Sequence, residues 1–209
     1  MKRAWAWILL AGTGCIDLKS SYPERHFYTL EAHRSGAERT PEAGTVLRVR
    51  RFTASKLCEG SELVTRTGGA TYEFDFYNVF CVPPSGQVGE QTQRWLSEAK
   101  LFGNVVGPGS SYPETHLLEG NLIALNGDFR RIDAPVASLE LQFMLMKVSP
   151  DCPGVLFQKT FRQEITIAKA EPDALVEGWS IGLGSILRAL EEDLSKVMNS
   201  RWEKKDQVR

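Results

Sequence analysis

The sequence has few residues of the kinds that carry metal or nucleophilic chemistry. Among its 209 residues are four cysteines and three histidines. After Cys15, the cysteines are Cys58, Cys81 and Cys152, whereas zinc sites usually contain two cysteines separated by two to four residues. His26, His33 and His116 do not form a two-histidine helical pattern. The sequence therefore predicts no metal site and no cofactor.

Motifs for acyl transfer and phosphate binding are also missing. No serine lies in a Gly-x-Ser-x-Gly turn. The glycine-rich segment 107–111 lacks the Gly-Lys-Ser/Thr ending of a phosphate-binding loop, and Pro108 has no amide to donate. Glu73 and Asp75 share one face of an expected strand, which suits general acid/base work, but we interpret them as surface carboxylates. We expect a protein without catalysis.

The sequence has neither an excess of charge of one sign nor a long apolar run. The chain has 25 basic and 26 acidic residues, whereas nucleic-acid binding needs clustered Lys and Arg, so we expect no nucleic-acid partner. The first apolar run covers residues 4–11, and a spanning helix needs about 20 apolar residues. This run is too short to anchor the chain in a bilayer as a helix.

What is present at the N-terminus is a secretion signal. Lys2 and Arg3 precede the apolar run, and Gly12-Thr13-Gly14 lead directly to Cys15. This ending resembles the lipobox of bacterial lipoproteins, in which the cysteine is diacylated and becomes the new N-terminus. Gly12 stands where that pattern has Leu. The alternative is an ordinary signal cut near Gly14, which leaves Cys15 as a free or paired thiol.

These features divide the chain into four parts. Residues 1–14 are a lipoprotein signal peptide, 15–24 a lipidated tether, 25–200 one domain, and 201–209 a charged, frayed tail. The residue after the cysteine is Ile16 rather than Asp, and the enterobacterial sorting pattern then favours the outer membrane. We therefore expect the domain in the cell envelope, facing the periplasm.

Hydrophobic periodicity predicts the elements of the domain. The expected strands are 26–30, 45–52, 62–66, 72–77, 104–106, 116–125, 135–148 and 155–168, and the expected helices are 83–102 and 172–200. Gly68-Gly69 predict a hairpin turn with positive φ. The fold class is α/β leaning to α+β: a single sandwich with a mainly antiparallel or mixed sheet and at least two helices.

Three side-chain arrangements follow from these elements. Arg48 and Arg50 share a strand face, and we expect them to pair with Glu73 and Asp75. Some of the helical glycines Gly178, Gly182 and Gly184 should be needed for close packing, since each weakens the helix by about 1 kcal/mol relative to Ala. The odd number of cysteines left after Cys15 permits one disulfide among Cys58, Cys81 and Cys152 or buried free thiols, and the sequence does not decide between them.

Several short motifs occur in a recognisable order. They are Phe27-Tyr28-Thr29-Leu30, residues 47–52, residues 63–66 ahead of the aromatic segment 72–77, Pro83-Pro84, residues 101–105, and residues 117–122 leading to Gly127-Asp128-Phe129. In this order they resemble the auxiliary lipoproteins of ABC-type transport systems, the paraquat-inducible protein C group. The resemblance covers residues 27–197. Residues 79–81 depart from it, because relatives carry Trp before the Pro-Pro pair.

The resemblance implies a Rossmann-like domain similar to the N-terminal domain of TolB. It also implies partners: a mammalian-cell-entry (MCE) type lipid-binding protein and an ABC permease and ATPase that move lipids or apolar toxins between membranes. Some relatives form ring-shaped homo-oligomers. The function expected is that of a membrane-anchored adaptor; the alternative is a lipid carrier, which needs an apolar cavity of roughly several hundred Å³.

Overall fold

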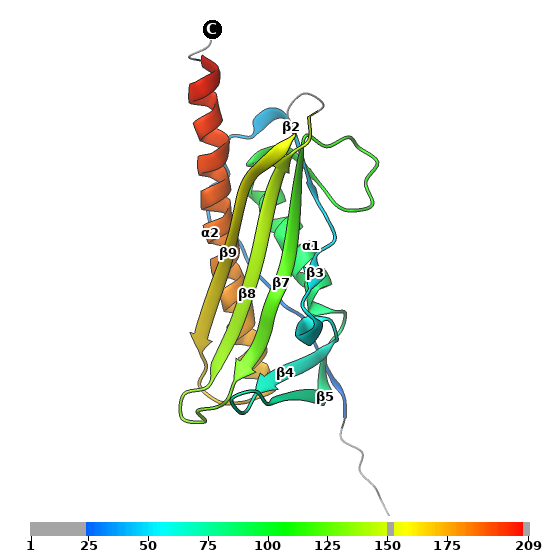
Figure 1. Ribbon diagram of the computed structural model, residues 1–209, viewed down its shortest axis with the longest axis vertical. Helices are drawn as coiled ribbons and strands as arrows, with labels where there is room; N and C mark the ends of the chain where they lie inside the picture. The colour runs from blue at the N-terminus through cyan, green and yellow to red at the C-terminus, as the bar shows by residue number, and fades with distance from the viewer. Residues whose placement is uncertain (1–23, 150–152, 207–209) are drawn as a thin grey trace, which may run out of the picture.

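The computed structural model describes residues 24–149 and 153–206 (Figure 1). The signal peptide, Cys15, Cys152 and residues 207–209 lie outside the described residues. The elements are β1 (His26–Tyr28), β2 (Glu42–Val49), β3 (Thr53–Ala54), the 3-10 turn η1 (Lys56–Cys58), β4 (Glu62–Arg66), β5 (Tyr72–Phe80), α1 (Pro84–Ala99), β6 (Phe102–Val106), β7 (His116–Asp128), β8 (Val136–Lys147), β9 (Gly154–Thr166) and α2 (Pro172–Asp206).

The described strands form one mixed sheet built around β7. Its order is β1-β5-β4-β7-β2-β6, and β3 and β8 also pair with β7. The long ladders β7–β8 and β8–β9 and the β4–β5 hairpin are antiparallel, whereas β1–β5, β2–β6, β2–β7, β3–β7 and β4–β7 are parallel. The predicted class, α/β leaning to α+β with a mixed sheet and two helices, is confirmed.

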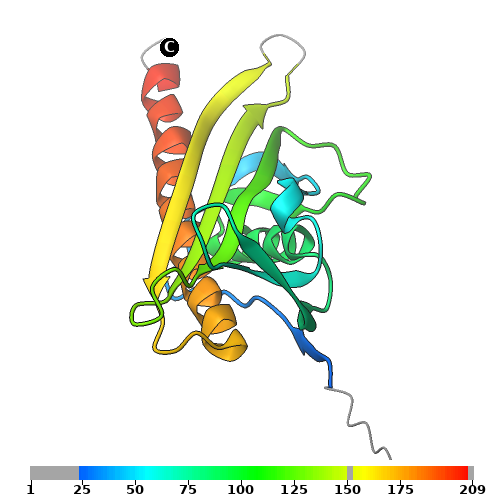
Figure 2. The ribbon, with the colours of Figure 1, turned by 60° about the horizontal axis from the view of Figure 1, so that its bottom comes forward.

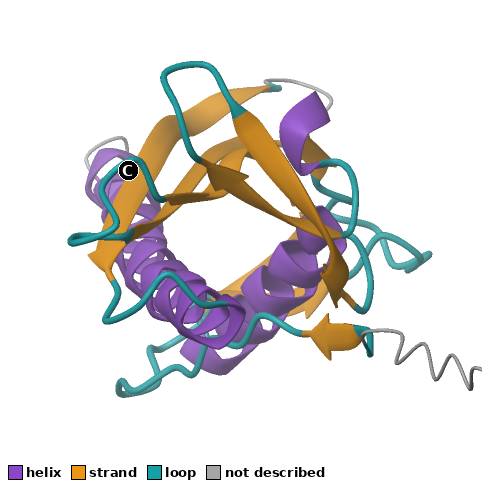
Figure 3. Cartoon of the chain, turned by 90° about the horizontal axis from the view of Figure 1, so that it is seen from below, coloured by secondary structure: helices purple, strands orange, loops and turns teal. Residues whose placement is uncertain are grey.

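Both helices lie on the same side of the curled sheet (Figures 2 and 3). Helix α2 packs on β8 and β9, and α1 packs on β2, β6 and β7. Alternate residues of β8 point into the core, where Leu139, Leu141, Phe143 and Leu145 are buried, as period-2 alternation requires. The apolar stripe of α2 is buried opposite them. Neither helix, within the described residues, is long and apolar enough to cross a membrane.

A glycine allows α2 to approach the sheet closely. A Cβ added at Gly178 would stand 2.7 Å from the Cβ of Ala137 and 2.8 Å from Cγ2 of Ile167. At Gly184, by contrast, nothing lies within 4 Å. The expectation that some of these glycines serve packing is confirmed at Gly178, and Gly184 has no such role.

Three local predictions were wrong. The β4–β5 turn does not use positive φ at Gly68 or Gly69; it is a longer loop, closed by hydrogen bonds from the amides of residues 67 and 68 to the Thr71 carbonyl, which reverses the chain without left-handed residues. Helix α1 ends at Ala99, because Lys100 adopts a left-handed φ of 54°. Helix α2 continues past the predicted end at residue 200 to Asp206.

A buried ionic cluster joins the segment after β1 to both helices. Glu191 of α2 is buried, and its carboxylate accepts hydrogen bonds from Arg34 (2.9 and 3.0 Å), from Arg39 Nε (2.9 Å) and from Trp95 Nε1 of α1 (2.9 Å). Arg39 also donates to Ser195 Oγ at 3.1 Å. Burial by itself raises the pKa of Glu191, but hydrogen bonds from Arg34, Arg39 and Trp95 outweigh it and hold the pKa below its ordinary value. Glu191 is therefore an ionised structural group.

Candidate functional site

The chain enters the domain at one end of the molecule, through strand β1. We call this end, where β1 and the β4–β5 hairpin lie at the bottom of Figure 1, the basal end. Cys15, the predicted lipidation site, lies outside the described residues, and Glu24 is the first residue described. Whatever holds the N-terminal segment therefore acts on the domain through β1.

Strand β1 is short but firmly attached to β5. It pairs in parallel with residues 78–80, and Arg25 Nε donates to the Phe76 carbonyl at 3.0 Å. The Tyr28 hydroxyl lies 2.8 Å from Asp173 Oδ1, at the start of α2, and 3.2 Å from Asn78 Oδ1. Burial and the hydrogen bond to Asp173 raise the pKa of Tyr28 to about 12, so the hydroxyl remains a donor. These bonds connect β1 to both the sheet and α2.

Strand β5 bulges next to this attachment. Between the pairs Glu62↔Val79 and Leu63↔Asp75 the register shifts, so that residues 76–78 are extra on the β5 side. The Asp75 carboxylate closes the bulge by accepting hydrogen bonds from the amides of Tyr77 (2.9 Å) and Asn78 (3.0 Å) and from Asn78 Nδ2 (2.8 Å). A bulge of this kind redirects side chains.

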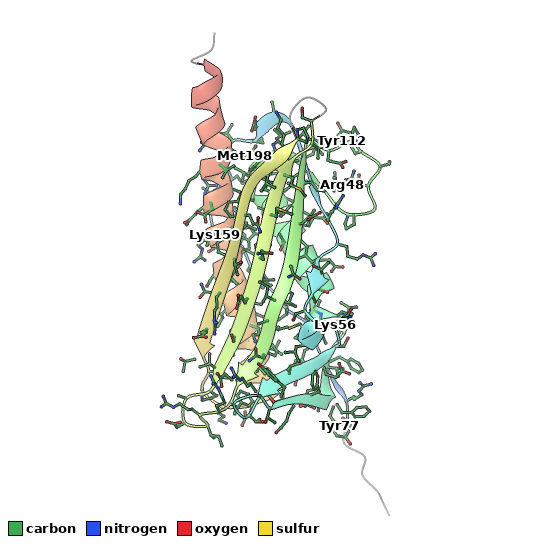
Figure 4. All side chains as sticks on the ribbon, in the orientation of Figure 1. Arg48, Lys56, Tyr77, Tyr112, Lys159 and Met198 are labelled. Atoms are coloured by element: carbon green, nitrogen blue, oxygen red, sulfur yellow. The ribbon has the colours of Figure 1, made fainter. Side chains whose placement is uncertain are left out.

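Large aromatic side chains of β1 and β5 are exposed next to this bulge. We call Phe27, Phe74, Phe76 and Tyr77, which are 62%, 54%, 65% and 41% exposed, the basal aromatic patch. The rings of Phe76 and Tyr77 meet edge to face at 5.4 Å, and the Arg25 guanidinium lies 4.8 Å from the Phe76 ring centre. Figure 4 shows Tyr77 at the basal end. The sequence indicated an aromatic strand at residues 72–77 but did not indicate that these side chains face solvent.

The predicted pairing of Arg48 and Arg50 with Glu73 and Asp75 is wrong. Arg48 binds Glu114 at 2.9 Å, and Arg50 binds Glu119 at 2.7 Å. The physical reason is the strand order, because β4 and β7 separate β5 from β2. Thr67 donates to Glu73 at 3.1 Å, and Asp75 closes the bulge.

The glycine-rich segment 107–111 is a loop, as predicted. Its carbonyl oxygens face a cation: Arg48 donates to the carbonyls of Gly107 (3.2 Å) and Ser110 (2.7 Å), and also to that of the adjacent Tyr112 (2.7 Å). A phosphate-binding loop does the opposite and points amide groups at an anion. Arg48 therefore organises this loop from the side of the sheet.

The described cysteines are not bonded to each other. Cys58 is buried and Cys81 is exposed, and within the described residues neither forms a disulfide. Burial raises the pKa of Cys58, although a hydrogen bond from Ser55 acts in the opposite direction, so Cys58 is not an activated nucleophile. Pairing of either thiol with Cys152, which lies outside the described residues, stays a prediction.

The three histidines differ in their surroundings. His26 and His33 are exposed, whereas the buried His116 has Nδ1 2.8 Å from Thr115 Oγ1 and its ring 5.5 Å from that of Phe102. No group of three His, Cys, Asp or Glu side chains in the described parts of the chain is placed to hold a metal ion.

The apolar side chains between the sheet and the helices form one cluster of buried residues. A surface groove of about 590 Å³ runs beside α2, but its lining includes the charged or polar residues Glu31, His33, Glu177 and Arg188. A smaller cavity of about 260 Å³ at the basal end has Leu63, Phe74, Phe129 and Leu175 in its wall; ligand pockets usually run to roughly 300–1,000 Å³. These two hollows offer little for an enclosed lipid.

Comparison with known proteins identifies the fold but not the family. No protein-family model matches the sequence, and no curated protein matches it. The DUF330 protein XCC0632 from Xanthomonas campestris superposes with a TM-score of 0.74 at 13% identity, covering 85% of this chain and 99% of that one. An uncharacterized protein superposes at 0.62 with 16% identity, covering 82% and 99%. At these identities the likeness shows a shared fold alone.

Proposed function

We propose that this chain is a lipid-anchored protein of the bacterial cell envelope that serves an ABC-type lipid transport system as an adaptor without catalysis. The observation that carries the proposal is the order of the first 15 residues: Lys2-Arg3, a short apolar run, and small residues directly before Cys15. Acyl chains on Cys15 would then hold the domain to a membrane, since each buried methylene contributes about 0.8 kcal/mol.

The environments of the described polar side chains support an adaptor rather than an enzyme. The carboxylates that could act as acid and base, Glu73 and Asp75, accept hydrogen bonds within their own hairpin. Glu191, the buried carboxylate, is held ionised by two arginines. Catalytic acids and bases need a pKa near the working pH, and a carboxylate with a lowered pKa is poorly suited to that work.

The transport role comes from the resemblance to auxiliary lipoproteins of ABC systems, and the α/β domain agrees with the fold which that resemblance implies. The partners proposed are an MCE-domain protein with its permease and ATPase, and the location proposed is the periplasmic face of the outer membrane; a homo-oligomer fits the same resemblance. Tethering raises effective concentration, so a modest interface with the partner suffices. The lipid-carrier alternative is weaker, because the groove beside α2 is lined in part by charged residues and the basal cavity is small.

Affinity capture from native envelopes tests the adaptor role. A tagged chain, cross-linked in the cell, is expected to retain a permease, an ATPase and an MCE-type protein. The matched control replaces residues 1–14 with a cleaved secretory signal and carries Cys15→Ala, which frees the domain in the periplasm; recovery of the partners should fall by about tenfold or more with the loss of tethering. Capture of no transporter subunit by the anchored chain would contradict the proposal.

A further inference from the structure

The basal aromatic patch lies at the same end of the molecule as the N-terminal entry of the chain. Its two strands, β1 and β5, are hydrogen-bonded neighbours, and Phe27 belongs to the strand that continues the N-terminal segment. Figure 4 shows Tyr77 at this end and Tyr112, another exposed aromatic side chain, at the opposite end of the long axis. The position of the patch thus coincides with the point of attachment.

The length of the N-terminal segment limits how far the patch can be from an anchoring membrane. Cys15 and Glu24 are nine positions apart, a span of at most about 30 Å when fully extended. A bilayer that holds acyl chains on Cys15 is therefore within reach of β1. Because β1 is fixed to β5 and α2, the aromatic side chains cannot turn away from that surface independently of the domain.

The chemistry of the patch suits the boundary between headgroups and acyl chains. Trp and Tyr are enriched at that boundary, and helices that lie in the interface bury Trp, Phe and Leu there. Arg25, stacked on Phe76, places a cation beside the rings, where a phosphate headgroup can accept from it. The acidic residues Glu73 and Asp75 lie on the same strand as the patch, so net positive charge is not the source of attraction.

We propose that the basal aromatic patch rests in the interface of the bilayer that holds Cys15, so that the domain stands on its basal end and not merely at the end of a loose tether. This inference rests on the proposed lipid anchor. It directs the other end of the molecule, with Tyr112 (Figure 4) and the C-terminal part of α2 (Figure 1), away from the membrane and toward the transport partner.

Shallow quenching by brominated lipid tests the inference. The acylated protein, carrying Tyr77→Trp, is reconstituted into phosphatidylcholine vesicles with and without bromine near the carbonyl end of the acyl chain. Fluorescence from residue 77 should fall about twofold with bromine, because interfacial rings lie at the headgroup level. Tyr112→Trp is the matched control and should not change. The unsubstituted protein supplies the background from the buried Trp95 and Trp179 and from Trp202.

A second variant tests whether the neighbouring Phe76 ring helps to hold residue 77 in the membrane interface. Adding Phe76→Ser to Tyr77→Trp should reduce the quenching, since half of the edge-to-face pair is lost. Equal quenching at residues 77 and 112, or none at residue 77, would overturn the inference; a protected residue 77 together with dimerisation on the vesicle would assign the patch to a second copy instead.

The intact mass of each sample separates the two proposals. Acylated protein with an unquenched Tyr77→Trp contradicts the membrane-resting patch and leaves the lipid anchor in place. Protein without acyl groups contradicts the anchor, and with it the inference that depends on it.

Discussion

Replacing Glu191 by Gln should destabilise the domain, because it leaves one buried arginine without a negative partner. The substitution keeps the volume of the side chain and one accepting oxygen, but it removes the charge that Arg34, Arg39 and Trp95 all contact. The Arg34 side chain is 6% exposed and that of Arg39 is 38% exposed. After the change Arg39 can turn to water, whereas Arg34 stays buried beside a neutral amide.

The size of the effect follows from that difference. Removing one partner of a buried ion pair costs about 3–5 kcal/mol, because the other charge is left uncompensated. Since Gln preserves one acceptor, we expect Glu191→Gln to lower the free energy of unfolding by about 3 kcal/mol, near the lower end of this range. Arg34→Met should cause a similar loss. Arg39→Met should cost about 1 kcal/mol, as partly exposed pairs do. For a domain of this size, 3 kcal/mol corresponds to a fall of roughly 6–12 °C in Tm.

Urea denaturation of the four proteins measures these free energies of unfolding. A double-mutant cycle between residues 34 and 191 isolates their interaction and should exceed that between residues 39 and 191. A loss below about 1 kcal/mol for Glu191→Gln, or equal coupling to both arginines, would refute the reasoning, because buried pairs cost more to break than partly exposed ones.

The same carboxylate predicts acid sensitivity. Its pKa in the folded state is held below the ordinary value of 4.5, so the unfolded chain binds the proton more readily. The stability that ionised Glu191 contributes is therefore fully present above pH 4.5 and is lost as the pH falls through the lower folded pKa. Between neutral pH and the onset of acid unfolding, Glu191→Gln should lose stability less steeply than the unsubstituted protein.

Further predictions concern the helix glycines, the thiols and β1. Gly178→Ala should destabilise the domain through its clash with the sheet, whereas Gly184→Ala should stabilise it by about 0.5–1 kcal/mol; urea denaturation compares the two. Maleimide should label Cys81 in the folded protein and Cys58 only after denaturation, as peptide mapping would show. Tyr28→Phe removes the hydrogen bond to α2 and should cost about 0.5–1.5 kcal/mol, with faster hydrogen exchange in β1.

Elements with strong local patterns could be predicted from the sequence. The alternation of residues 139–145 predicts the buried face of β8. The apolar stripe of residues 179–197 predicts the face of α2 that packs on the sheet, because burial on one side of an element has a fixed period. Gly178 could be suspected because a glycine within a helix weakens it and so needs a packing reason.

Features that depend on which strands become neighbours could not be predicted. Arg48 lies far from Asp75 in the sheet because β7 and β4 intervene, and hydropathy does not encode strand order. The exposure of Phe76 follows from a bulge that Asp75 closes, a short-range hydrogen-bond choice that alternation conceals. Glu191 does carry a sequence signal: it lies one helical turn from both Leu187 and Leu194, on the apolar side of the helix, where a carboxylate needs a buried cation.

Intact-mass spectrometry of the mature protein extracted from its native envelope tests the central proposal most directly. The lipid anchor predicts a chain that begins at Cys15 and carries a diacylglyceryl group on the thiol, with the first 14 residues removed. A chain that begins at Cys15 with an unmodified thiol, or that washes from the envelope without acyl groups, would contradict it.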